Sequence, residues 1–520
     1  MERIKVEDPD LTESKDEVLR KSNAFTKQET KLSNHLIIQK KLQDGYYVGE
    51  FRNEKPHGKG KMTYKNGNYY EGEWLEGVPH GKGKETYDDK YYEGDWQNGF
   101  PHGEGIETYD DGYYMGEWQN GKPHGLGSAK YLDWEYEGEF FDGKRSGNGK
   151  ALFANGHDYQ GEWKDDQPHG QGIEYHDSAK RDLKVAPYYQ GGWEKGFPHG
   201  EGTLRLHEYK IYTGQFSKGF ISGEGVMDEV DYTYNGQFRD GDFHGRGRKQ
   251  FKNCDNYYEG QWKNGEPDGK GEKVYEDGTY KGKFSQGLPN GHGKAIFKSG
   301  REYEGDWVDG EPQGKGIEVT HDGRYRGDFK FGKRHGKGKM TYKSGFVYEG
   351  DWRLDEKDGV GIETYKDGDY NGHFSKGKRH GKGKYSYAQG GFYEGDWEHG
   401  VPSGRGRAEF KNGNSYEGEW RNGEPHGKGK KVFSSGNHYE GDFKYGQPEG
   451  NGEATFEGDV VKYVGEWKSG KRNGKGVQTE AEGVYEGEFL NGFKHGRGKF
   501  TKNGDGEVKE GEWRNDKFMI

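Results

Sequence analysis

The chain has 520 residues, of which only 28% are hydrophobic, and more than half of these are aromatic. A chain of this length ordinarily divides into several globular domains, but leucine, isoleucine and valine are too scarce here for several aliphatic cores. With 33% charged residues and 96 glycines, the composition by itself favours disorder. The net charge of −11 is nevertheless small for this length, and disordered chains are usually poor in aromatic residues, so we expect an ordered arrangement of rings.

The amino-acid composition also argues against several classes of protein. The single cysteine, Cys254, excludes an intrachain disulfide and fits a reducing compartment. The amino terminus has no apolar signal-peptide core and no stretch approaches about 18 apolar residues, so we expect a soluble, intracellular, cytoplasmic protein. The mildly acidic balance argues against nucleic acid as a partner, because nucleic acid favours a basic face.

The beginning of the chain lacks the repetition seen further along. We expect residues 1–35 to be flexible or to form a short helix around residues 11–25. Residues 36–46 are interpreted as a possible half-repeat that caps the repetitive part of the chain.

A motif of the form Tyr-x-Gly-x-Trp/Phe begins at Tyr47 and recurs every 22 to 24 residues, which gives about twenty repeats over residues 47–508. One interval is longer, and its extra residues at 177–188 are interpreted as a surface loop. A truncated copy occupies residues 509–520 and leaves an open sheet edge, which invites pairing with another chain.

One repeat, residues 92–113, shows the predicted parts. Its first run, Tyr92 to Trp96, and its second run, Gly103 to Tyr109, both alternate with period two, as in strands. Asn-Gly, Asp-Gly and Ser-Gly pairs before the next Tyr, such as Asp111-Gly112, supply the positive φ of tight turns, so the two runs are read as a β-hairpin with its other turn at residues 98–102. Twelve of the fourteen prolines lie near this turn, and we place them within it because proline cannot donate to a strand ladder.

Side chains on the two faces of the predicted hairpins have different roles. On one face, a glycine between two rings leaves space for aromatic side chains of neighbouring hairpins, so we expect rings to pack edge to face or offset. On the other face, acids such as Glu71 and Glu73 come from the first strand and bases such as Lys82 and Lys84 from the second. Cross-strand pairing of these charges at about 0.2 to 1 kcal/mol each explains many charges with little net charge.

Tyr-Glu-Gly-Glu-Trp followed by Gly-x-Pro-His-Gly-x-Gly resembles the MORN repeat (membrane occupation and recognition nexus), and the resemblance covers residues 47–513. It implies an all-β fold, an elongated, twisted, single-layer antiparallel sheet of about twenty consecutive β-hairpin repeats. Two strands per repeat at the usual strand spacing predict a length on the order of 190 Å.

The residues that ordinarily carry chemistry are repeated rather than concentrated. Equivalent histidines in consecutive repeats are about 10 Å apart, too far for two to bind one zinc ion, so we interpret them as turn-stabilising. They are His57, His80, His102, His124, His169, His199, His244, His335, His380, His426 and His495. A general acid/base pair requires one repeat that differs from the rest, and Gly-x-Gly without a strand-to-helix context is a weak nucleotide signal. We therefore expect no catalytic residue, cofactor or metal, and no enzyme activity.

From Tyr258 onward, Trp and Phe nearly alternate at the fifth position of the motif, which indicates a two-repeat period of about 45 residues. The turns of the Phe-type repeats are basic and recur at this period. A solvated charged edge and a site for an acidic partner both remain open as interpretations. The candidate interaction residues, including the apolar carboxyl terminus, are Lys333, Arg334, Lys337, Lys339, Lys378, Arg379, Lys382, Lys384, Lys471, Arg472, Phe518 and Ile520.

Three functions are compatible with these observations. The first hypothesis is a non-catalytic structural scaffold that organises proteins of a cytoskeletal assembly, because chains made almost wholly of MORN repeats resemble radial-spoke head components of the ciliary axoneme and ring scaffolds of protists. A homo-oligomer through the terminal sheet edge belongs to this hypothesis. The alternative is a peripheral membrane tether whose basic turns meet phosphoinositides, against which stands the net negative charge. The third is a regulatory arm for an enzyme on a separate chain.

Overall fold

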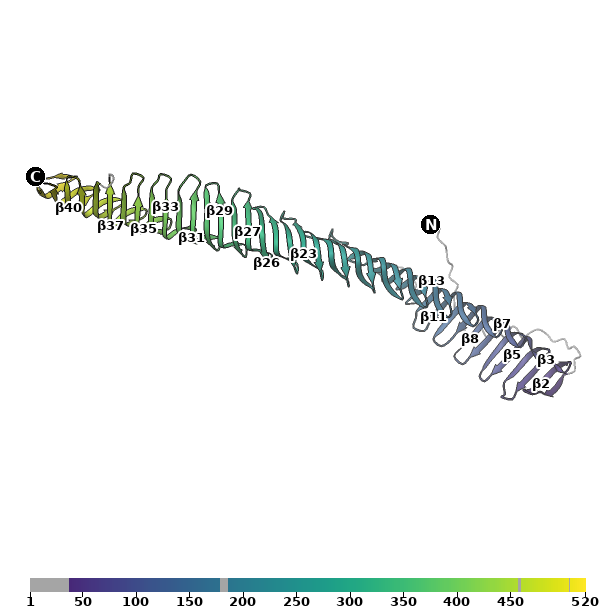
Figure 1. Ribbon diagram of the computed structural model, residues 1–520. Helices are drawn as coiled ribbons and strands as arrows, with labels where there is room; N and C mark the ends of the chain where they lie inside the picture. Colours follow the sequence, from purple (N-terminus) through teal and green to yellow (C-terminus); the bar gives the residue numbers. More distant parts are fainter. Residues whose placement is uncertain (1–36, 178–185, 457–459, 505) are drawn as a thin grey trace. The chain divides into compact units, whose positions relative to one another are not determined.

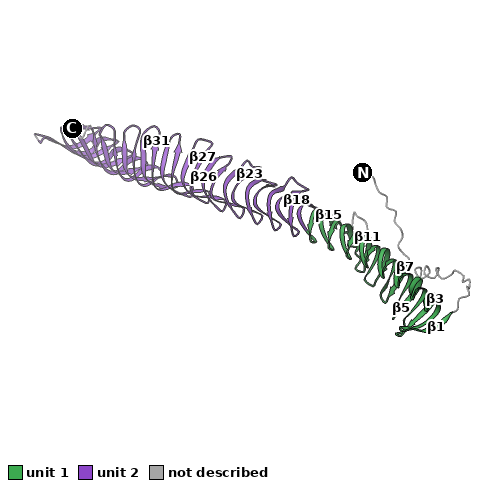
Figure 2. Ribbon diagram, turned by 45° about the vertical axis from the view of Figure 1, so that its right-hand side comes forward, with its two compact units in different colours: residues 1–220 green, residues 221–520 purple. Residues whose placement is uncertain are grey.

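The computed structural model describes residues 37–177, 186–456, 460–504 and 506–520 (Figure 1). The chain divides into two compact units, residues 1–220 and 221–520 (Figure 2). The predicted amino-terminal segment 1–35 and the greater part of the predicted surface loop at 177–188 lie outside the described residues.

Unit 1 is an open antiparallel sheet in which each strand pairs with the next along the chain (Figure 1). Its strands are β1 (Ile38–Lys41), β2 (Gly45–Arg52), β3 (Lys55–Tyr64), β4 (Tyr69–Leu75), β5 (Val78–Tyr87), β6 (Lys90–Gln97), β7 (Phe100–Tyr109), β8 (Gly112–Gln119), β9 (Lys122–Lys130), β10 (Trp134–Phe141), β11 (Lys144–Phe153), β12 (Asp158–Lys164), β13 (Gln167–Tyr175), β14 (Tyr188–Glu194), β15 (Phe197–His207) and β16 (Lys210–Ser217).

Unit 2 has the same construction, and the first of its strands starts at the boundary between the units. Its strands are β17 (Phe220–Asp228), β18 (Tyr232–Arg239), β19 (Asp242–Phe251), β20 (Tyr257–Lys263), β21 (Glu266–Tyr275), β22 (Gly278–Ser285), β23 (Leu288–Phe297), β24 (Glu302–Val308), β25 (Glu311–Val319), β26 (Gly323–Lys330), β27 (Lys333–Tyr342), β28 (Val347–Arg353), β29 (Glu356–Tyr365), β30 (Gly368–Ser375), β31 (Lys378–Tyr387), β32 (Phe392–Glu398), β33 (Val401–Glu409), β34 (Ser415–Arg421), β35 (Glu424–Val432), β36 (His438–Lys444), β37 (Gln447–Phe456), β38 (Val461–Lys468), β39 (Lys471–Glu480), β40 (Gly483–Leu490), β41 (Phe493–Lys502), β42 (Val508–Arg514) and β43 (Lys517–Phe518). The predicted all-β fold of consecutive antiparallel hairpins is confirmed in both units.

The repeat that begins at Tyr325 illustrates the core. Tyr325 is 0% exposed, and its ring meets Phe329 of its own strand at 5.1 Å and Trp352 of the next repeat at 5.3 Å, both edge to face. The Trp352 ring then meets Tyr348, so the rings form a continuous row along one face of the sheet. Edge-to-face pairs of this kind contribute about 0.5–1.5 kcal/mol each beyond burial. The predicted ring packing is therefore confirmed.

Glycine is required under each tyrosine ring. A Cβ on Gly338 would lie 2.1 Å from the Tyr325 hydroxyl oxygen, which is far inside van der Waals contact. This close approach also lets the Tyr325 hydroxyl donate a hydrogen bond to the Asp328 carbonyl at 3.0 Å. The Trp352 indole N–H reaches over the same strand and donates to the Gly338 carbonyl at 3.1 Å. Tyrosine and tryptophan thus bury their rings while their polar atoms remain hydrogen-bonded.

A β-bulge divides the second strand of each repeat. In β27 the bulge lies at Gly336, which has a φ of 58°, opposite the step from Gly327 to Asp328. The Asp328 carboxylate closes it by accepting a hydrogen bond from the Lys337 backbone N–H at 3.0 Å. We call this pairing of a first-strand acid with a bulge N–H the bulge clamp. Unbroken period-two alternation from Gly103 to Tyr109, as predicted from the sequence, would place Gly103 on the face of Gly105, but Gly103 lies at the bulge with a φ of 66°.

The twelve prolines of the repeats lie inside strands and not in the turns, which corrects the prediction. The turns are formed by the two residues that precede each of these strands, such as Asn98 and Gly99 before β7, and both have positive φ. Pro101 is the second residue of β7 and faces Trp96. Its carbonyl accepts a hydrogen bond from the Gly121 N–H of the next turn at 2.8 Å. Proline, which lacks an N–H, is tolerated at this position because the hydrogen bond to the next turn uses only the proline carbonyl.

Candidate functional site

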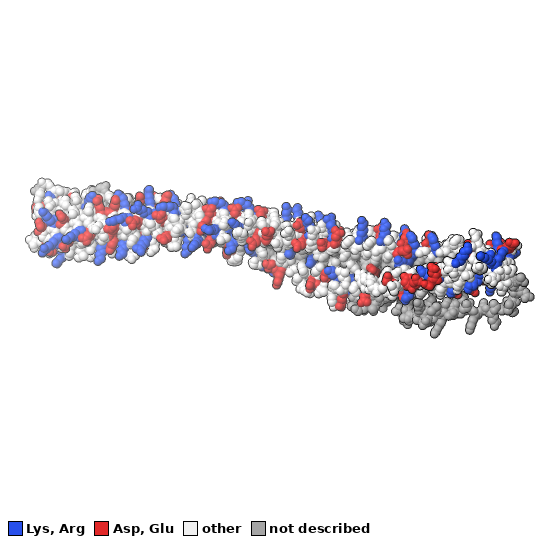
Figure 3. Space-filling view, turned by 90° about the horizontal axis from the view of Figure 1, so that it is seen from below, with Lys and Arg blue, Asp and Glu red and all other residues white. Residues whose placement is uncertain are grey.

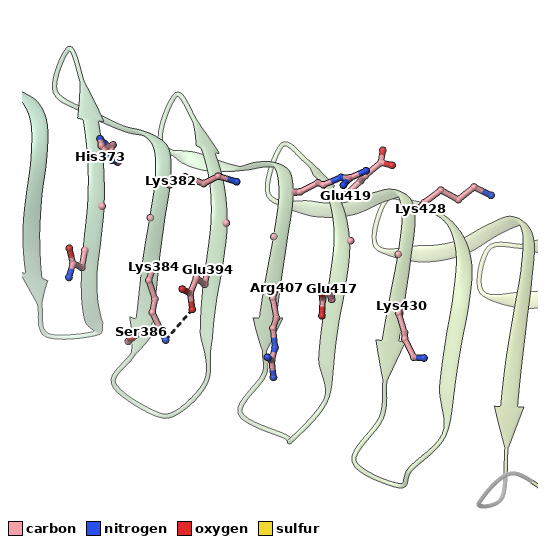
Figure 4. Close-up of a pocket in the computed structure, with 18 of the residues that line it drawn as sticks. His373, Lys382, Lys384, Ser386, Glu394, Arg407, Glu417, Glu419, Lys428 and Lys430 are labelled. Atoms are coloured by element: carbon pink, nitrogen blue, oxygen red, sulfur yellow. Dashed lines mark ion pairs between the residues drawn. The ribbon is translucent and has the colours of Figure 1, made fainter.

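The face of the sheet opposite the rings carries ion pairs between neighbouring strands, such as Lys84 with Glu93 and Lys339 with Glu349. Figure 3 shows basic and acidic side chains interspersed on the visible surface. In unit 2 this face contains a shallow groove of about 1460 Å³ that crosses neighbouring strands from β29 to β36. Its walls are alternately basic and acidic, and its floor is glycine backbone (Figure 4).

Four of the predicted interaction lysines lie on this charged face and are held in ion pairs. Lys337 and Lys339 of β27 pair with Asp351 at 2.6 Å and Glu349 at 2.9 Å on β28. One two-repeat period later, the lysines at 382 and 384 form the same contacts: Lys382 pairs with Asp396 at 2.6 Å, and Lys384 with Glu394 at 3.2 Å, the dashed pair in Figure 4. Because their charges are matched within the sheet, these four lysines are poor candidates for binding a separate anion.

Two further candidates, Arg334 and Arg379, fold over the ring face instead. Arg334 contacts Glu318 at 3.0 Å, and Arg379 contacts Glu363 at 2.9 Å. Each glutamate is also bound by a second cation, Arg301 at 2.7 Å for Glu318 and Lys357 at 2.5 Å for Glu363.

Both carboxylates of these clusters are buried, with 6% exposure for Glu318 and 3% for Glu363. The Arg379 guanidinium lies 4.8 Å from the centroid of the Tyr370 ring, so it also makes a cation–π contact. We call this arrangement a cation slot: a buried glutamate and its neighbouring rings, which bind the arginine of the strand two positions further along the sheet. The arginines of the basic turns are thus internal structural groups and not free surface charges.

The remaining basic candidates divide in the same way. Arg472 lies over the ring face, where its guanidinium donates to the Gly492 carbonyl at 2.5 Å and contacts Gln478. Lys333, Lys378 and Lys471 are the first residues of β27, β31 and β39, and all three are exposed at one edge of unit 2. Beside Lys333 lies Phe331, which is 62% exposed and has a φ of 53°. A bulky residue in this backbone region is unusual and indicates strain.

The two apolar candidates at the carboxyl end have different environments. Phe518 pairs with Trp513 in the last hairpin, and their ring centroids are 5.2 Å apart. It therefore covers the end of the ring row. Ile520 is fully exposed. At the opposite end, β1 pairs with β2 and ends the described part of unit 1.

The regularly spaced histidines lie next to the bulges and not in the turns, so their interpretation as turn residues is wrong in position. His335, for example, pairs with Asp328 in the ladder, directly before the bulge glycine. In five repeats the histidine Nδ1 is buried without a hydrogen-bond partner in the described structure: His57, His80, His244, His335 and His495. The described residues contain no group of three or more His, Cys, Asp or Glu side chains placed to hold a metal ion.

The cation slots were missed from the sequence. Glu318 and Glu363 lie between consecutive tyrosines, at a position where several other repeats place a small or apolar residue, such as Met340 or Ala408. Each is followed 16 residues later by an arginine in place of proline. That paired departure from the consensus was the available signal.

Twenty consecutive segments match the MORN repeat family, at residues 47–69, 70–90, 92–112, 114–134, 136–158, 159–178, 189–206, 212–228, 234–253, 258–279, 280–300, 303–323, 325–347, 348–370, 370–392, 393–415, 416–438, 439–458, 463–480 and 485–506. No curated protein matches the chain. Within the described residues, no helix has the length and apolar character needed to span a bilayer. The matched segments cover most of the chain and coincide with the hairpins of the structure, so the chain belongs to the MORN repeat family.

Proposed function

We propose that the protein is a non-catalytic structural scaffold that holds partner proteins in a cytoskeletal assembly, with the ciliary axoneme and its radial spokes as the site to examine first. The observation that carries this proposal is the reuse of one set of contacts in repeat after repeat. In the repeats that begin at Tyr92, Tyr325 and Tyr393, the tyrosine hydroxyl donates to the same backbone carbonyl and the same bulge clamp forms. Such an array offers many equivalent positions at fixed spacing to partners.

The scaffold proposal is tested by extraction and localisation. A tagged chain expressed in ciliated cells is expected to remain with the detergent-insoluble cytoskeleton and to label the axoneme. The tag alone serves as the control and is expected to be extracted completely. Full release of the tagged chain at physiological salt, together with a diffuse cytoplasmic signal, would contradict the proposal.

A second function, peripheral attachment to anionic membranes, is favoured by one observation. At the exposed edge of unit 2, the Phe331 ring lies 5.3 Å from the Lys330 ammonium, and the exposed Lys333 follows two residues later in the chain. An aromatic side chain flanked by lysines fits the interface of an anionic bilayer. Lys333 and Lys378 are better test positions than Arg334, because Arg334 is bound to Glu318 and its loss would disturb the core.

Vesicle flotation with and without phosphoinositide separates this function from the first. Lys333→Glu with Lys378→Glu is expected to abolish flotation. Lys343→Glu with Lys366→Glu is the matched control, because these exposed lysines lie in turns at the opposite edge of the same unit. No flotation of the unmodified chain at low salt, or equal loss in both variants, would remove the membrane function.

A further inference from the structure

Unit 1 contains three glutamates in the register of the cation slots of unit 2, and one of them, Glu174, is already contacted by His157 and His176. The other two are Glu85 and Glu107. Glu85 lies in the ladder between Tyr70 and Tyr92, as Glu318 lies between Tyr303 and Tyr325. Glu107 has the same position one repeat later, between Tyr92 and Tyr114. A tyrosine follows each of them two residues on, Tyr87 and Tyr109, as Tyr365 follows Glu363 in unit 2.

The cation that fills each slot in unit 2 is missing from these two positions. Residue 334 or 379, which is 16 residues after the glutamate, is arginine in unit 2. The residues 16 positions after Glu85 and Glu107 are Pro101 and Pro123, which face Trp96 and Trp118 as Arg379 faces Phe374. Within the described residues, no ion pair joins Glu85 or Glu107 to a cation. A proline at this position cannot supply one.

The environment of the two carboxylates agrees with an unfilled slot. Glu318 and Glu363 are buried beneath their arginines, whereas Glu85 and Glu107 are only half-buried. Tyr87 and Tyr109 both donate hydrogen bonds to Glu107, the first at 3.4 Å. A carboxylate offers about four acceptor positions, so each retains capacity for a guanidinium. Burial raises the pKa of the Glu85 carboxyl despite a hydrogen bond from Tyr64, as expected for a partly buried acid without a cation.

Unit 1 also contains an arginine at the slot position that lacks its glutamate. Arg145 replaces the proline in unit 1, but the residue 16 positions before it is Ala129. Its guanidinium stacks 4.5 Å from the Trp163 ring centroid and pairs with Asp166, while one terminal nitrogen is buried without a partner among the described residues. The buried ion pair of a cation slot therefore requires both the glutamate and the arginine 16 residues after it.

We infer that Glu85 with Tyr87, and Glu107 with Tyr109, form two binding sites for arginine side chains of a partner protein. Arginine is the expected ligand because Arg334 and Arg379 fill the equivalent positions in unit 2, each with a charge-assisted hydrogen bond to the glutamate and a cation–π contact. This inference rests on the proposed scaffold role, which supplies the protein partner. It adds that the partner is bound through arginine side chains.

The spacing of the two sites also selects the form of the partner segment. The glutamates lie two strands apart, on β5 and β7, which corresponds to about 10 Å. A polyproline II segment places every third side chain on one face at intervals of about 9 Å. An Arg-x-x-Arg segment in this conformation therefore presents two guanidinium groups at the spacing of the two glutamates.

The test uses the full chain and a fluorescent peptide that contains Arg-Pro-Pro-Arg, with binding followed by fluorescence anisotropy. The same peptide with citrulline in place of both arginines keeps the shape without the charge and is expected to bind at least tenfold more weakly. Glu85→Gln with Glu107→Gln is expected to weaken binding of the arginine peptide at least tenfold. Glu104→Gln with Glu137→Gln is the matched control, because it removes the same charge from exposed positions of the same unit and should change binding less than twofold.

A second pair of variants fills the sites without removing the carboxylates. Pro101→Arg with Pro123→Arg supplies each glutamate with the internal arginine that unit 2 has, and binding is expected to fall at least tenfold while the circular dichroism spectrum is retained. The inference is overturned if this variant binds the peptide as the unmodified chain does, or if arginine and citrulline peptides bind equally. Because the assay uses purified protein, its failure leaves the localisation test of the scaffold role unaffected.

Discussion

Contact between a tyrosine ring and a glycine α-carbon determines which residues each repeat accepts. The Tyr325 ring lies over Gly338 so closely that a single methyl group has no space, and the ring hydroxyl already donates a hydrogen bond to the Asp328 carbonyl of its own strand. A protein with few aliphatic residues can be ordered in this way, because rings bury large areas and glycine lets them approach the backbone.

Replacing Gly338 with alanine is expected to destabilise unit 2 by about 3 kcal/mol, because the new Cβ must displace the Tyr325 ring or the strand. Thermal melting gives the overall loss, and hydrogen exchange is expected to show it first in β26 to β28. Lys337→Ala is the control, since this neighbouring lysine is exposed and forms only a surface ion pair with Asp351, worth at most about 1 kcal/mol. Equal melting temperatures for the two variants would contradict the packing argument.

The ring core was predicted from the sequence, whereas the burial of Arg334 and Arg379 was not. Period-two alternation places Tyr92 and Trp96 on one face whatever the tertiary context. Arg379, by contrast, looks like a solvated turn residue from its neighbours Lys378 and His380. Its partner Glu363 is two strands away and 16 residues earlier, so the composition around Arg379 does not indicate that the two side chains meet over a ring. Local composition therefore identified the basic turns but misjudged which charges remain free.

At the scale of the hairpin, the bulge was the feature that sequence reasoning lacked. The prediction assumed unbroken alternation and no extra residue in the second strand. It therefore assigned the prolines to the turns and the histidines to positions beside them. The bulge clamp also explains why the fourth position of the motif is usually acidic or an amide: its side-chain oxygen must reach a backbone N–H nine residues on. A bulge bends and twists a strand, so the clamp fixes local sheet geometry in every repeat that carries it.

The bulge clamps predict a dependence of stability on pH. Hydrogen bonds from Lys337 or Lys382 and from a backbone N–H outweigh burial and lower the pKa of Asp351 and Asp396 below the ordinary value. A carboxyl whose folded pKa is lowered stabilises the fold above its unfolded pKa, and this contribution is lost as the pH falls through the folded pKa. Stability from the clamps is therefore expected to be complete at neutral pH and to decline below about pH 4.

The measurement is the melting temperature between pH 7 and pH 2.5 for the unmodified chain and for a triple variant, Asp351→Asn, Asp396→Asn and Asp442→Asn. Asparagine keeps an acceptor for the bulge N–H but does not titrate in this range. The variant is expected to be less stable at pH 7 and to lose less on acidification. Parallel curves for the two proteins would show that these carboxyls are not the groups that titrate.

At the scale of the whole chain, each repeat contacts mainly its neighbours, so stability is expected to depend on repeats and their interfaces more than on distant contacts. The sequence predicts a length on the order of 190 Å from strand spacing, and small-angle scattering of the intact chain is the measurement for it. The two-repeat period adds a further constraint within unit 2, because the cation slots at Glu318 and Glu363 recur 45 residues apart.

Deletion of one whole period provides a direct test of this modularity. Removing residues 325–369 joins Arg324 to Tyr370, restores the motif, and places Glu318 and Arg379 16 positions apart, the spacing of the native slots. We expect the shortened chain to keep its circular dichroism per residue and to melt within about 3 °C of the full chain, because every new neighbour repeats an existing contact. Removing only residues 325–335 deletes the first strand, the turn and the bulge histidine of one repeat, so two second strands become neighbours in a sheet that requires them to alternate. That variant is expected to melt far lower or to aggregate, and equal behaviour of the two deletions would show that the repeat is not the structural unit.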